Sequence, residues 1–328
     1  MQEHQIDSTI KVSVLVPVYR VEKHIERCVR SLFEQTMKDN IEFIFVNDAT
    51  PDNSIAILER IIDEYPERKK NIRIINHDSN QGLAVVRVTG VKAAKGEYVI
   101  HCDSDDWVEP DMYRQMYETA KANDSDIVIC SYFSEFGGSR EVHHQSLLSG
   151  REEIASSILR IEKIHQFLWQ RLVRKKFYDK YDFRATPGIT YCEDFAVVIP
   201  MHLMTNKVSV IDVPLYHYNC ANADSMTQVR DVRRIEAGKM ALDFVEKYIV
   251  THNHPAVLPA LQYRKFLYYL PLITCLESYD PKRWLELDIP TLDIKLMARS
   301  RISVWLVRHR LFMANKLLQI AVRKIFNR

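Results

Sequence analysis

The stretch KVSVLVPVYRVEKHIERCVRSLFEQTMKDNIEFIFVNDA, residues 11–49, holds two apolar runs on either side of a segment with a different period. Its two ends, residues 11–19 and 41–49, are rich in β-branched and aromatic residues, which favours strands. Between them, apolar residues recur every three or four positions, as on one face of a helix. These residues are Ile25, Val29, Leu32 and Phe33. A strand, a helix and a second strand in this order predict a right-handed crossover between parallel strands.

The same alternation continues to about residue 103. Helices are predicted at 52–65 and 81–95, and strands at 71–77 and 96–103. The strands lack strict alternation of apolar and polar residues, which indicates that both of their faces are buried. The fold class is therefore α/β, a Rossmann-like and mostly parallel sheet with helices on both faces.

The pattern is less regular after residue 113. Residues 125–136 predict another strand, and residues 152–173 and 192–204 predict helices. The segment 207–218 predicts two strands that are separated at Pro214, because proline cannot donate to a sheet ladder. From about residue 231 onward the pattern is almost entirely helical, so we expect a sheet-containing domain followed by a helical C-terminal region at 231–328.

The composition is that of an ordinary globular protein. Of the 328 residues, 47% are hydrophobic and 27% are charged, and a net charge of +2 is too small to indicate a nucleic-acid partner. The six cysteines form no C-x-x-C pair, which favours a reducing, cytoplasmic setting. We expect neither a signal peptide nor a membrane span, since no apolar run approaches about 20 residues.

The last 35 residues have a charge pattern of their own. Residues 294–328 contain nine Lys or Arg and no Asp or Glu. A helix from Arg301 onward would place an apolar stripe opposite the basic residues; the stripe is Val304, Val307, Leu311, Leu318, Val322 and Ile325. One interpretation is an amphipathic helix of residues 295–328 on an anionic membrane surface. The other is a helix packed on the rest of the protein or on a second copy.

Polar and acidic residues gather where the predicted strands end. In an open parallel sheet, ligands bind beyond the carboxyl ends of the strands, so these residues predict one shared pocket. They are Pro17 and Tyr19, Asn47, Asp48 and Asp52, Asn76 and Gly82, and Asp103 to Asp106. Taken singly, several of them are also typical of turns and helix caps.

Asp103, Ser104 and Asp105 form a D-x-D element directly after a predicted buried strand. Two carboxylates one residue apart can share one hard cation, with Mg²⁺ or Mn²⁺ completing its shell from phosphate oxygens and water. The alternative is a solvated acidic turn. The position at a strand end favours the cation site.

Four ordered segments resemble the inverting, nucleotide-sugar-dependent glycosyltransferases of family 2, which have the GT-A fold. The segments are VSVLVPVYRVEKHIERCVRSLFEQT, VNDATPDNS, NQGLAVVRVTGVKAAKGEYVIHCDSDD and the set EDFAVVIPMHLM, VSVIDVPLYHYN and DSMT, within residues 11–228. The resemblance implies a catalytic domain at 1–230. Its nucleotide-sugar-binding half is expected at about 11–110 and its acceptor and base half at about 111–230.

The resemblance also implies individual roles. Residues expected to bind the donor nucleotide are Pro17, Tyr19, Glu22, Asp48, Asn76, Gly82, Arg87, Asp103 and Ser104. Among these, Asp48 is implied to bond with the base, usually uracil, and Arg87 to lie near the pyrophosphate. Asp105 is the implied ligand of Mn²⁺ or Mg²⁺, and Asp103 lies beside the metal and the ribose.

Asp194 matches the catalytic base of the family, and Glu193 stands beside it. An inverting displacement needs a base on the acceptor side and charge stabilisation on the leaving-group side, which agrees with this allocation. Acidic residues are also favoured in the first turn of a helix, and we assign that simpler role to Glu193.

Three further residues have competing interpretations. His217 is either a metal or phosphate ligand or a packed histidine, and Trp107 is either a platform for a sugar ring or a core residue. Ser225 is expected to contact phosphate or the acceptor. Asp106 is expected to be structural or paired with an arginine.

The expected activity is transfer of a hexosyl or N-acetylhexosaminyl group from a UDP-sugar to a glycan or lipid-linked acceptor in cell-surface polysaccharide synthesis. The expected location is the cytoplasm or the inner face of its membrane, with no nucleic-acid partner. A sugar-phosphate nucleotidyltransferase is less favoured, because PVYRVEKH after the first strand contains no glycine for a phosphate loop. A nucleotide-binding module without turnover is the third alternative.

This sequence departs from the common family pattern at two places. Asn47-Asp48-Ala49-Thr50 replaces the usual DDGS, and Arg87-Val88 replaces RN. The second change removes a polar group, so the detailed contacts to the donor are not predicted.

Overall fold

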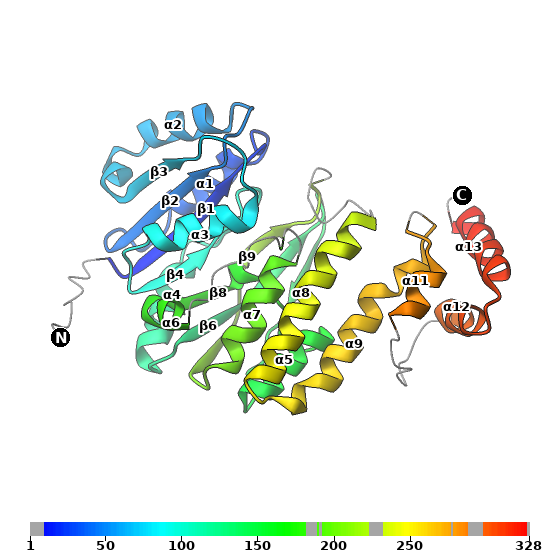
Figure 1. The fold of residues 1–328 in the computed structure, drawn as a ribbon. Helices are drawn as coiled ribbons and strands as arrows, with labels where there is room; N and C mark the ends of the chain where they lie inside the picture. The colour runs from blue at the N-terminus through cyan, green and yellow to red at the C-terminus, as the bar shows by residue number, and fades with distance from the viewer. Residues whose placement is uncertain are drawn as a thin grey trace. The chain divides into compact units, whose positions relative to one another are not determined.

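A computed structural model describes residues 10–181, 189, 192–222, 232–276, 278–287 and 298–326. The chain forms two compact units, Met1–Ala223 and Asp224–Arg328. The first unit contains the sheet, and all regular structure in the described part of the second is helical. Figure 1 shows the order of the elements along the chain.

The N-terminal part of the first unit has the predicted alternation of strands and helices. Its elements are β1 (Val12–Val18), α1 (Ile25–Phe33), β2 (Ile41–Asn47), α2 (Ser54–Glu64), the 3₁₀ turn η1 (Pro66–Asn71), β3 (Ile72–Asn76), α3 (Leu83–Ala93) and β4 (Tyr98–His101). The four strands pair in parallel in the order β3-β2-β1-β4. The predicted crossovers between parallel strands are therefore confirmed.

The remainder of the first unit extends the same sheet with strands of both directions. Its elements are β5 (Trp107–Val108), α4 (Met112–Ala122), β6 (Ile127–Glu135), β7 (Arg140–His143), α5 (Arg151–Arg160), η2 (Leu168–Gln170), β8 (Arg171–Arg174), α6 (Lys175–Tyr181), α7 (Glu193–Leu203) and β9 (Val208–Asn219). The full strand order is β3-β2-β1-β4-β8-β6-β9-β5, with β7 paired to β6. Strand β8 is antiparallel to both β4 and β6, whereas β9 is parallel to β6. The α/β class is confirmed, and β8 is inserted antiparallel between β4 and β6, which run in the same direction.

Two predicted elements were wrong. The helix expected at 152–173 ends at Arg160, and Arg171–Arg174 instead forms β8 between two core strands. The strand pair expected at 207–218 is one strand, β9. It continues through Pro214 because the register with β6 shifts on either side of the Ser131–Pro214 pair, and such an irregularity tolerates a missing donor.

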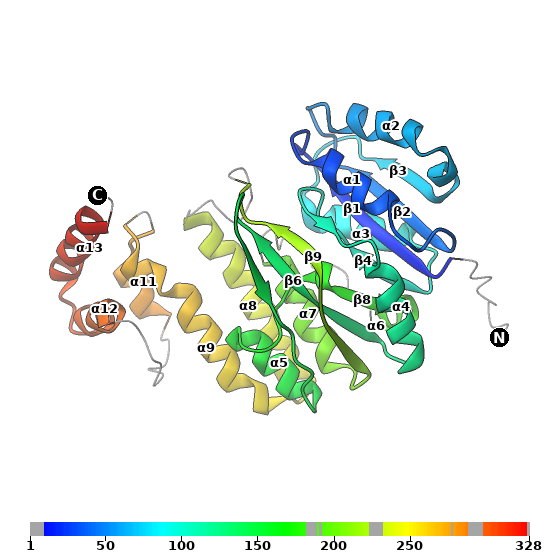
Figure 2. The same ribbon diagram turned by 180° about the vertical axis from the view of Figure 1, so that it is seen from behind.

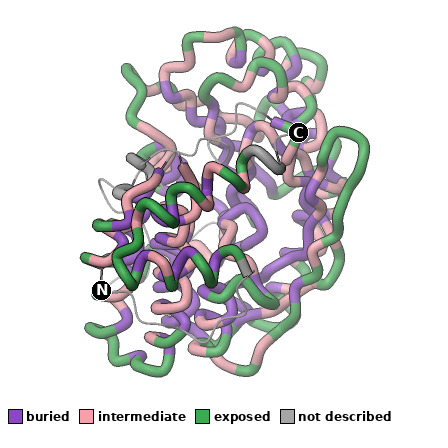
Figure 3. Tube along the Cα trace, turned by 90° about the vertical axis from the view of Figure 1, so that its right-hand side faces the viewer, coloured by how far each residue is buried: buried purple, intermediate pink, exposed green. Residues whose placement is uncertain are grey.

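Strand β1 is buried on both faces, which explains its unbroken apolar run. Val12, Val14, Val16 and Val18 belong to the core shared with α1, which lies on the face seen in Figure 2. On the other face, Leu15 approaches Gly90 of α3 so closely that a Cβ at Gly90 would lie 3.3 Å from its Cδ1. Buried residues, purple in Figure 3, follow the strands through the interior.

The second unit consists of helices α8 (Val232–Thr251), α9 (Leu258–Tyr269), α10 (Pro271–Thr274), α11 (Pro281–Glu286), α12 (Ala298–Arg308) and α13 (Phe312–Phe326), with the 3₁₀ turn η3 (Pro255–Val257). None of the helices in the described residues has the length and hydropathy needed to cross a bilayer. The stripe predicted to face a membrane is wrong in its first two members. Val304 and Val307 are 9% and 0% exposed, because they pack inside this unit.

Gly96 sits where three strands are tied together by side-chain hydrogen bonds. Its amide donates to Ser13 Oγ at 2.8 Å, and Ser13 Oγ donates to Glu42 Oε1 at 2.6 Å. A Cβ at position 96 would lie 2.6 Å from the backbone nitrogen of Ser13. Relieving this contact requires a shift of the sheet backbone, which costs free energy in a close-packed interior.

We therefore expect Gly96→Ala to lower the free energy of unfolding by about 1–3 kcal/mol, the usual cost of an overpacked core. Urea denaturation followed by circular dichroism measures it. Gly138→Ala is the matched control, because a Cβ there meets nothing within 4 Å. Equal stability of the two variants would contradict this assignment.

Candidate active site

The loop before α3 is closed by Asp48. Its carboxylate accepts hydrogen bonds from the backbone amides of Gln81 and Gly82, at 2.9 and 2.8 Å, and contacts His77 Nδ1 at 2.8 Å. Gly82 takes a φ of +86° at the start of the helix, a conformation that suits glycine. Asp48 is only 2% exposed. Both carboxylate oxygens of Asp48 already have partners within this loop, and the contact between Asp48 and a base stays a prediction.

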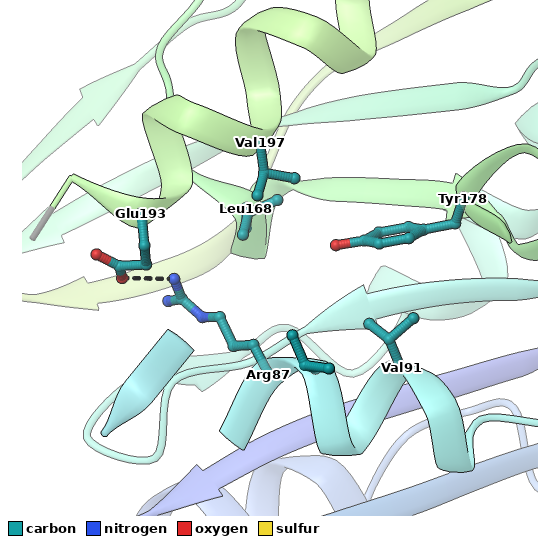
Figure 4. Close-up of a pocket in the computed structure, with 7 residues that line it drawn as sticks. Arg87, Val91, Leu168, Tyr178, Glu193 and Val197 are labelled. Atoms are coloured by element: carbon teal, nitrogen blue, oxygen red, sulfur yellow. Dashed lines mark hydrogen bonds and ion pairs between the residues drawn. The ribbon is translucent and has the colours of Figure 1, made fainter. Parts of the chain in front are cut away.

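Helix α3 carries Arg87 into a cluster of three carboxylates. Its Nη1 donates to Glu193 Oε1 at 2.7 Å and to Asp194 Oδ1, and its Nη2 donates to Asp103 Oδ1 at 3.2 Å. Figure 4 shows the guanidinium of Arg87 pointing at Glu193 from the facing helix. One buried arginine thus joins the D-x-D element that follows β4 to the first turn of α7.

The cluster holds more negative than positive charge. Burial raises the pKa of Glu193 to about 7, although the charge of Arg87 acts in the opposite direction. Burial likewise raises the pKa of Asp194. Desolvation on its own would lower the pKa of Arg87, but the three surrounding carboxylates outweigh it and raise that pKa. Arg87 is therefore a permanent cation within this group.

Helix α7 presents its two acidic residues at its first turn, after Cys192 takes a left-handed conformation with φ of 58°. The backbone amide of Leu168 donates to Asp194 Oδ2 at 3.3 Å, so both carboxylate oxygens of Asp194 have a partner. A narrow pocket adjoins the cluster, lined by Arg87, Val88, Val91, Leu168, Tyr178, Glu193 and Val197. Its mainly apolar wall accounts for the desolvation that raises the two carboxyl pKa values.

Strand β9 anchors the D-x-D element. The hydroxyl of Tyr216 donates to Asp106 Oδ2 at 2.7 Å and accepts from the backbone amide of Asp103 at 3.1 Å. The amide of Asn219 donates to Asp106 Oδ1 at 2.8 Å. Asp106 is 1% exposed, and burial raises its pKa well above the ordinary value. Asp106 is thus structural, held by a tyrosine and a backbone amide.

Asp103 and Asp105 fit a shared cation. Burial and the charge of Asp103 raise the pKa of Asp105, so a positive charge placed between them would be favoured. Asn222 Nδ2 holds Asp105 Oδ2 at 2.8 Å. In the described part of the chain no group of three or more His, Cys, Asp or Glu is arranged to hold a metal. Two carboxylates suit a cation such as Mg²⁺ that takes its other ligands from phosphate and water.

The structure disagrees with a metal-binding role for His217. Its Nδ1 contacts Glu135 Oε1 at 2.8 Å and its Nε2 contacts Glu109 Oε1 at 2.9 Å. Both ring nitrogens therefore already have a carboxylate partner within the protein, and His217 is only 4% exposed, which favours the packed interpretation. The ring is also stacked on Phe133, at 4.7 Å between centroids.

Trp107 is half-buried and has two neighbours against its ring. One face of its ring stacks on His217, with 5.0 Å between centroids, and the guanidinium of Arg27 lies over the ring as well. Sugar rings need a free aromatic face, so the platform interpretation is not supported. Ser225 lies outside the described residues.

The remaining donor-side residues lie at or after the carboxyl ends of β1 to β4. Tyr19 is exposed directly after β1, where Pro17 is half-buried, and Ser104 is buried in the D-x-D turn. Glu22 Oε2 accepts from the backbone and side-chain nitrogens of Asn53, at 3.0 and 3.1 Å, and so ties the loop after β1 to the start of α2.

Asn47 and Asn76, both expected at the strand ends, lie together: Asn47 Nδ2 donates to the exposed Asn76 Oδ1 at 2.9 Å, which places an amide pair at the ends of β2 and β3. Two other contributors were not predicted. In the segment LYHYN only His217 was predicted to have a role in the site. The structure instead shows Tyr216 and Asn219 of this segment bonded to Asp106 in the acidic turn. No sequence signal marked them, because Tyr216 and Asn219 are three positions apart and so do not share a face by the two-residue period of a strand, and Asn219 acts through its backbone amide.

Comparisons with known proteins agree with this geometry. Residues 13–185 match the model of Glycosyl transferase family 2, which is more than half of the chain. Putative glycosyltransferase EpsH of Bacillus subtilis (strain 168) is 36% identical over 236 residues, 70% of this chain and 66% of that protein. Uncharacterized glycosyltransferase EpsJ of the same organism is 33% identical over 224 residues, 66% of this chain and 63% of that protein. The chain thus spans just under two thirds of the length of both relatives.

A solved structure covers nearly the whole chain. S. aureus TarS 1-349 in complex with UDP-GlcNAc has a TM-score of 0.69 at 18% identity, over 96% of this chain and 92% of that one. Likeness at this identity shows a shared fold, which agrees with the GT-A fold expected from the sequence. The extent of the family match decides the classification: the chain belongs to glycosyl transferase family 2.

Proposed function

We propose that this protein is an inverting glycosyltransferase that moves a sugar from a UDP-sugar to a hydroxyl group of an acceptor. One observation carries the proposal. Arg87 gathers Asp103 of the D-x-D element and Asp194 of α7 into a single cluster. A donor-side acidic pair and a candidate base are the two parts that an inverting displacement requires.

Asp194 is the proposed base. It takes the proton of the acceptor hydroxyl while the acceptor oxygen bonds to the anomeric carbon and the bond from that carbon to the diphosphate oxygen breaks. The products are the inverted glycoside and UDP, with the proton on Asp194. Burial supports this role because it raises the pKa of Asp194 and makes the carboxylate more basic. Arg87 and the amide of Leu168 hold the carboxylate in place.

Glu193 is proposed to balance the charge of Arg87 rather than to remove a proton. Its Oε1 accepts from the same Nη1 that contacts Asp194. Glu193 also stands in the first turn of α7, where an acidic side chain is favoured whether or not it moves a proton.

Asp105 and Asp103 are the residues proposed to hold Mn²⁺ or Mg²⁺. Such a cation, when bound, neutralises charge on a departing diphosphate. The S. aureus TarS complex contains UDP-GlcNAc, which supports a UDP-sugar as the first donor class to test. Residues proposed to line the donor nucleotide are Pro17, Tyr19, Glu22, Asn76, Gly82 and Ser104.

We place donor binding in residues 11–110 and the base and acceptor in residues 111–230. The proposed acceptor is a glycan or a lipid-linked glycan in cell-surface polysaccharide synthesis, and the transferred group is a hexosyl or N-acetylhexosaminyl unit. The proposed location is the cytoplasm, at the inner face of its membrane. It is supported by the six cysteines, none of which forms a disulfide.

We expect Asp194→Asn to lower the turnover of UDP-sugar by about 10²–10⁴-fold, the contribution typical of a general base. UDP affinity should be retained, because Asp194 does not belong to the donor side. UDP release, measured with a panel of UDP-sugars and acceptors, and UDP titration calorimetry together check this. Glu193→Gln is the matched neighbour and should keep most of the turnover. Normal turnover by Asp194→Asn would contradict the assignment of Asp194 as the base.

We expect Asp105→Asn to abolish the effect of metal on nucleotide binding. In the unsubstituted protein, Mn²⁺ should raise the thermal stabilisation by UDP, because tighter binding stabilises the folded state by mass action. The measurement is the melting temperature with UDP, with and without Mn²⁺. Asp63→Asn serves as a control, since Asp63 is exposed and pairs only with Lys69 among the described residues. Mn²⁺-dependent stabilisation of Asp105→Asn equal to that of the control would refute the metal site.

A further inference from the structure

The C-terminal helix pair of the second unit, α12 and α13, buries several polar side chains and exposes several large apolar ones, although Val304 and Val307 of α12 are buried. Ser303, Asn315 and Gln319 are almost completely buried. Trp305, Met313 and Leu317 are 55%, 72% and 61% exposed. Helices that pack in water normally bury the apolar residues and expose the polar ones. The exposure of these large apolar side chains, next to buried polar ones, therefore needs an explanation.

Hydrogen bonds fix the inward face of the pair. Gln319 Nε2 donates to Ser303 Oγ at 2.8 Å across the two helices. Asn315 Nδ2 donates to the carbonyl oxygen of Ile273 at 2.9 Å and contacts the hydroxyl of Tyr279 at 3.2 Å. Rolling either helix would leave these buried polar groups without partners, which is costly. The outward face is consequently determined by the fold of this unit and is not interchangeable with the inward one.

The outward face carries large apolar side chains close together in sequence. We call it the outer face and define it by Ile302, Trp305, Leu311, Met313 and Leu317, all at least 44% exposed. Single exposed apolar residues are common on protein surfaces, but a group of five on one helix pair is typical of an interaction site. Figure 1 shows α12 and α13 next to each other at the C-terminal end of the chain.

Positive charge surrounds the outer face. Residues 294–328 contain nine Lys or Arg and no Asp or Glu. Arg301, Arg310 and Lys316 are exposed, and no acidic side chain within the described residues forms an ion pair with any of them. The occupant of this surface must therefore supply both an apolar layer and negative charge.

We propose that the outer face docks on an anionic phospholipid bilayer, with α12 and α13 lying along its surface. Tryptophan is enriched at the boundary between lipid headgroups and acyl chains, and Lys or Arg beside it attract anionic headgroups. No helix in the described residues can cross a bilayer, so the contact is at the surface. A second copy of the chain is disfavoured, because a two-fold contact through this face would bring two basic clusters together.

The proposal does not depend on the catalytic assignment, because the outer face contains none of the residues proposed for transfer. It places the protein where a lipid-linked or growing surface glycan would be found.

The test is co-sedimentation of the 328-residue chain with vesicles of phosphatidylcholine, with or without about one third phosphatidylglycerol. We expect binding to the anionic vesicles and loss of about tenfold in affinity or more for Trp305→Ser/Met313→Ser/Leu317→Ser, through lost apolar burial. The matched control is Met240→Ser/Val250→Ser, which removes exposed apolar side chains from α8 in the same unit. Melting temperatures of both variants verify that they fold.

Two further measurements separate a lipid surface from other occupants. Arg301→Gln/Arg310→Gln/Lys316→Gln should weaken binding to anionic vesicles and reduce its dependence on salt. The blue shift of tryptophan fluorescence on vesicle binding should disappear in Trp305→Phe. Absence of binding to anionic vesicles, unchanged binding of the triple serine variant, or a dimer in light scattering that this variant abolishes would each overturn the proposal.

Discussion

The ion cluster around Arg87 is the interaction on which the candidate site depends. A guanidinium that is 6% exposed is tolerable only with carboxylate partners, and three converge on it from two separate elements. The arginine comes from α3, Asp103 follows β4, and the other two acids begin α7. Breaking such a buried pair by removing one partner typically costs about 3–5 kcal/mol. The cluster therefore couples the folding of the parallel part of the sheet to the placement of the proposed base.

The excess of acid in this cluster also gives the site its chemistry. Two of the acids are buried beside an apolar wall, which raises their pKa values and makes Asp194 a better proton acceptor than an exposed aspartate. Burial and the neighbouring charge of Asp103 raise the pKa of Asp105, which is why these two residues are the proposed holders of a cation. Tyr216 and Asn219 hold Asp106 and the backbone amide of Asp103, and Asn222 holds Asp105, so contacts within the protein fix the acidic turn.

Local patterns predicted the first half of the fold well, because strands buried on both faces and amphipathic helices have distinct periods. The strand Arg171–Arg174 was missed because four residues after a helical segment carry no period of their own, and only pairing with β4 and β6 makes them a strand. Pro214 suggested a break, but an irregularity in the β6–β9 register accommodates it.

The sequence predicted those parts of the candidate site that lie within local motifs. Asp103, Asp194 and Arg87 follow ordered motifs, and the structure brings them together. His217 and Trp107 could not be assigned from sequence, because the carboxylates and rings that occupy them come from distant segments. The predicted apolar stripe of the basic tail is only partly correct for a related reason: Val304 and Val307 are buried whereas Leu311 is 44% exposed, and no local pattern reports which face packs inward.

The most direct test of the Arg87 cluster is a double-mutant cycle of unfolding free energies for Arg87→Met, Glu193→Gln and the combined variant. Arg87→Met should lose about 3–5 kcal/mol, because it leaves three buried carboxylates without a cation. The combined variant should recover part of that loss, since one of the three charges is then gone. An Arg87→Met protein as stable as the unsubstituted one, or a combined variant whose losses simply add, would contradict the central place given to this arginine.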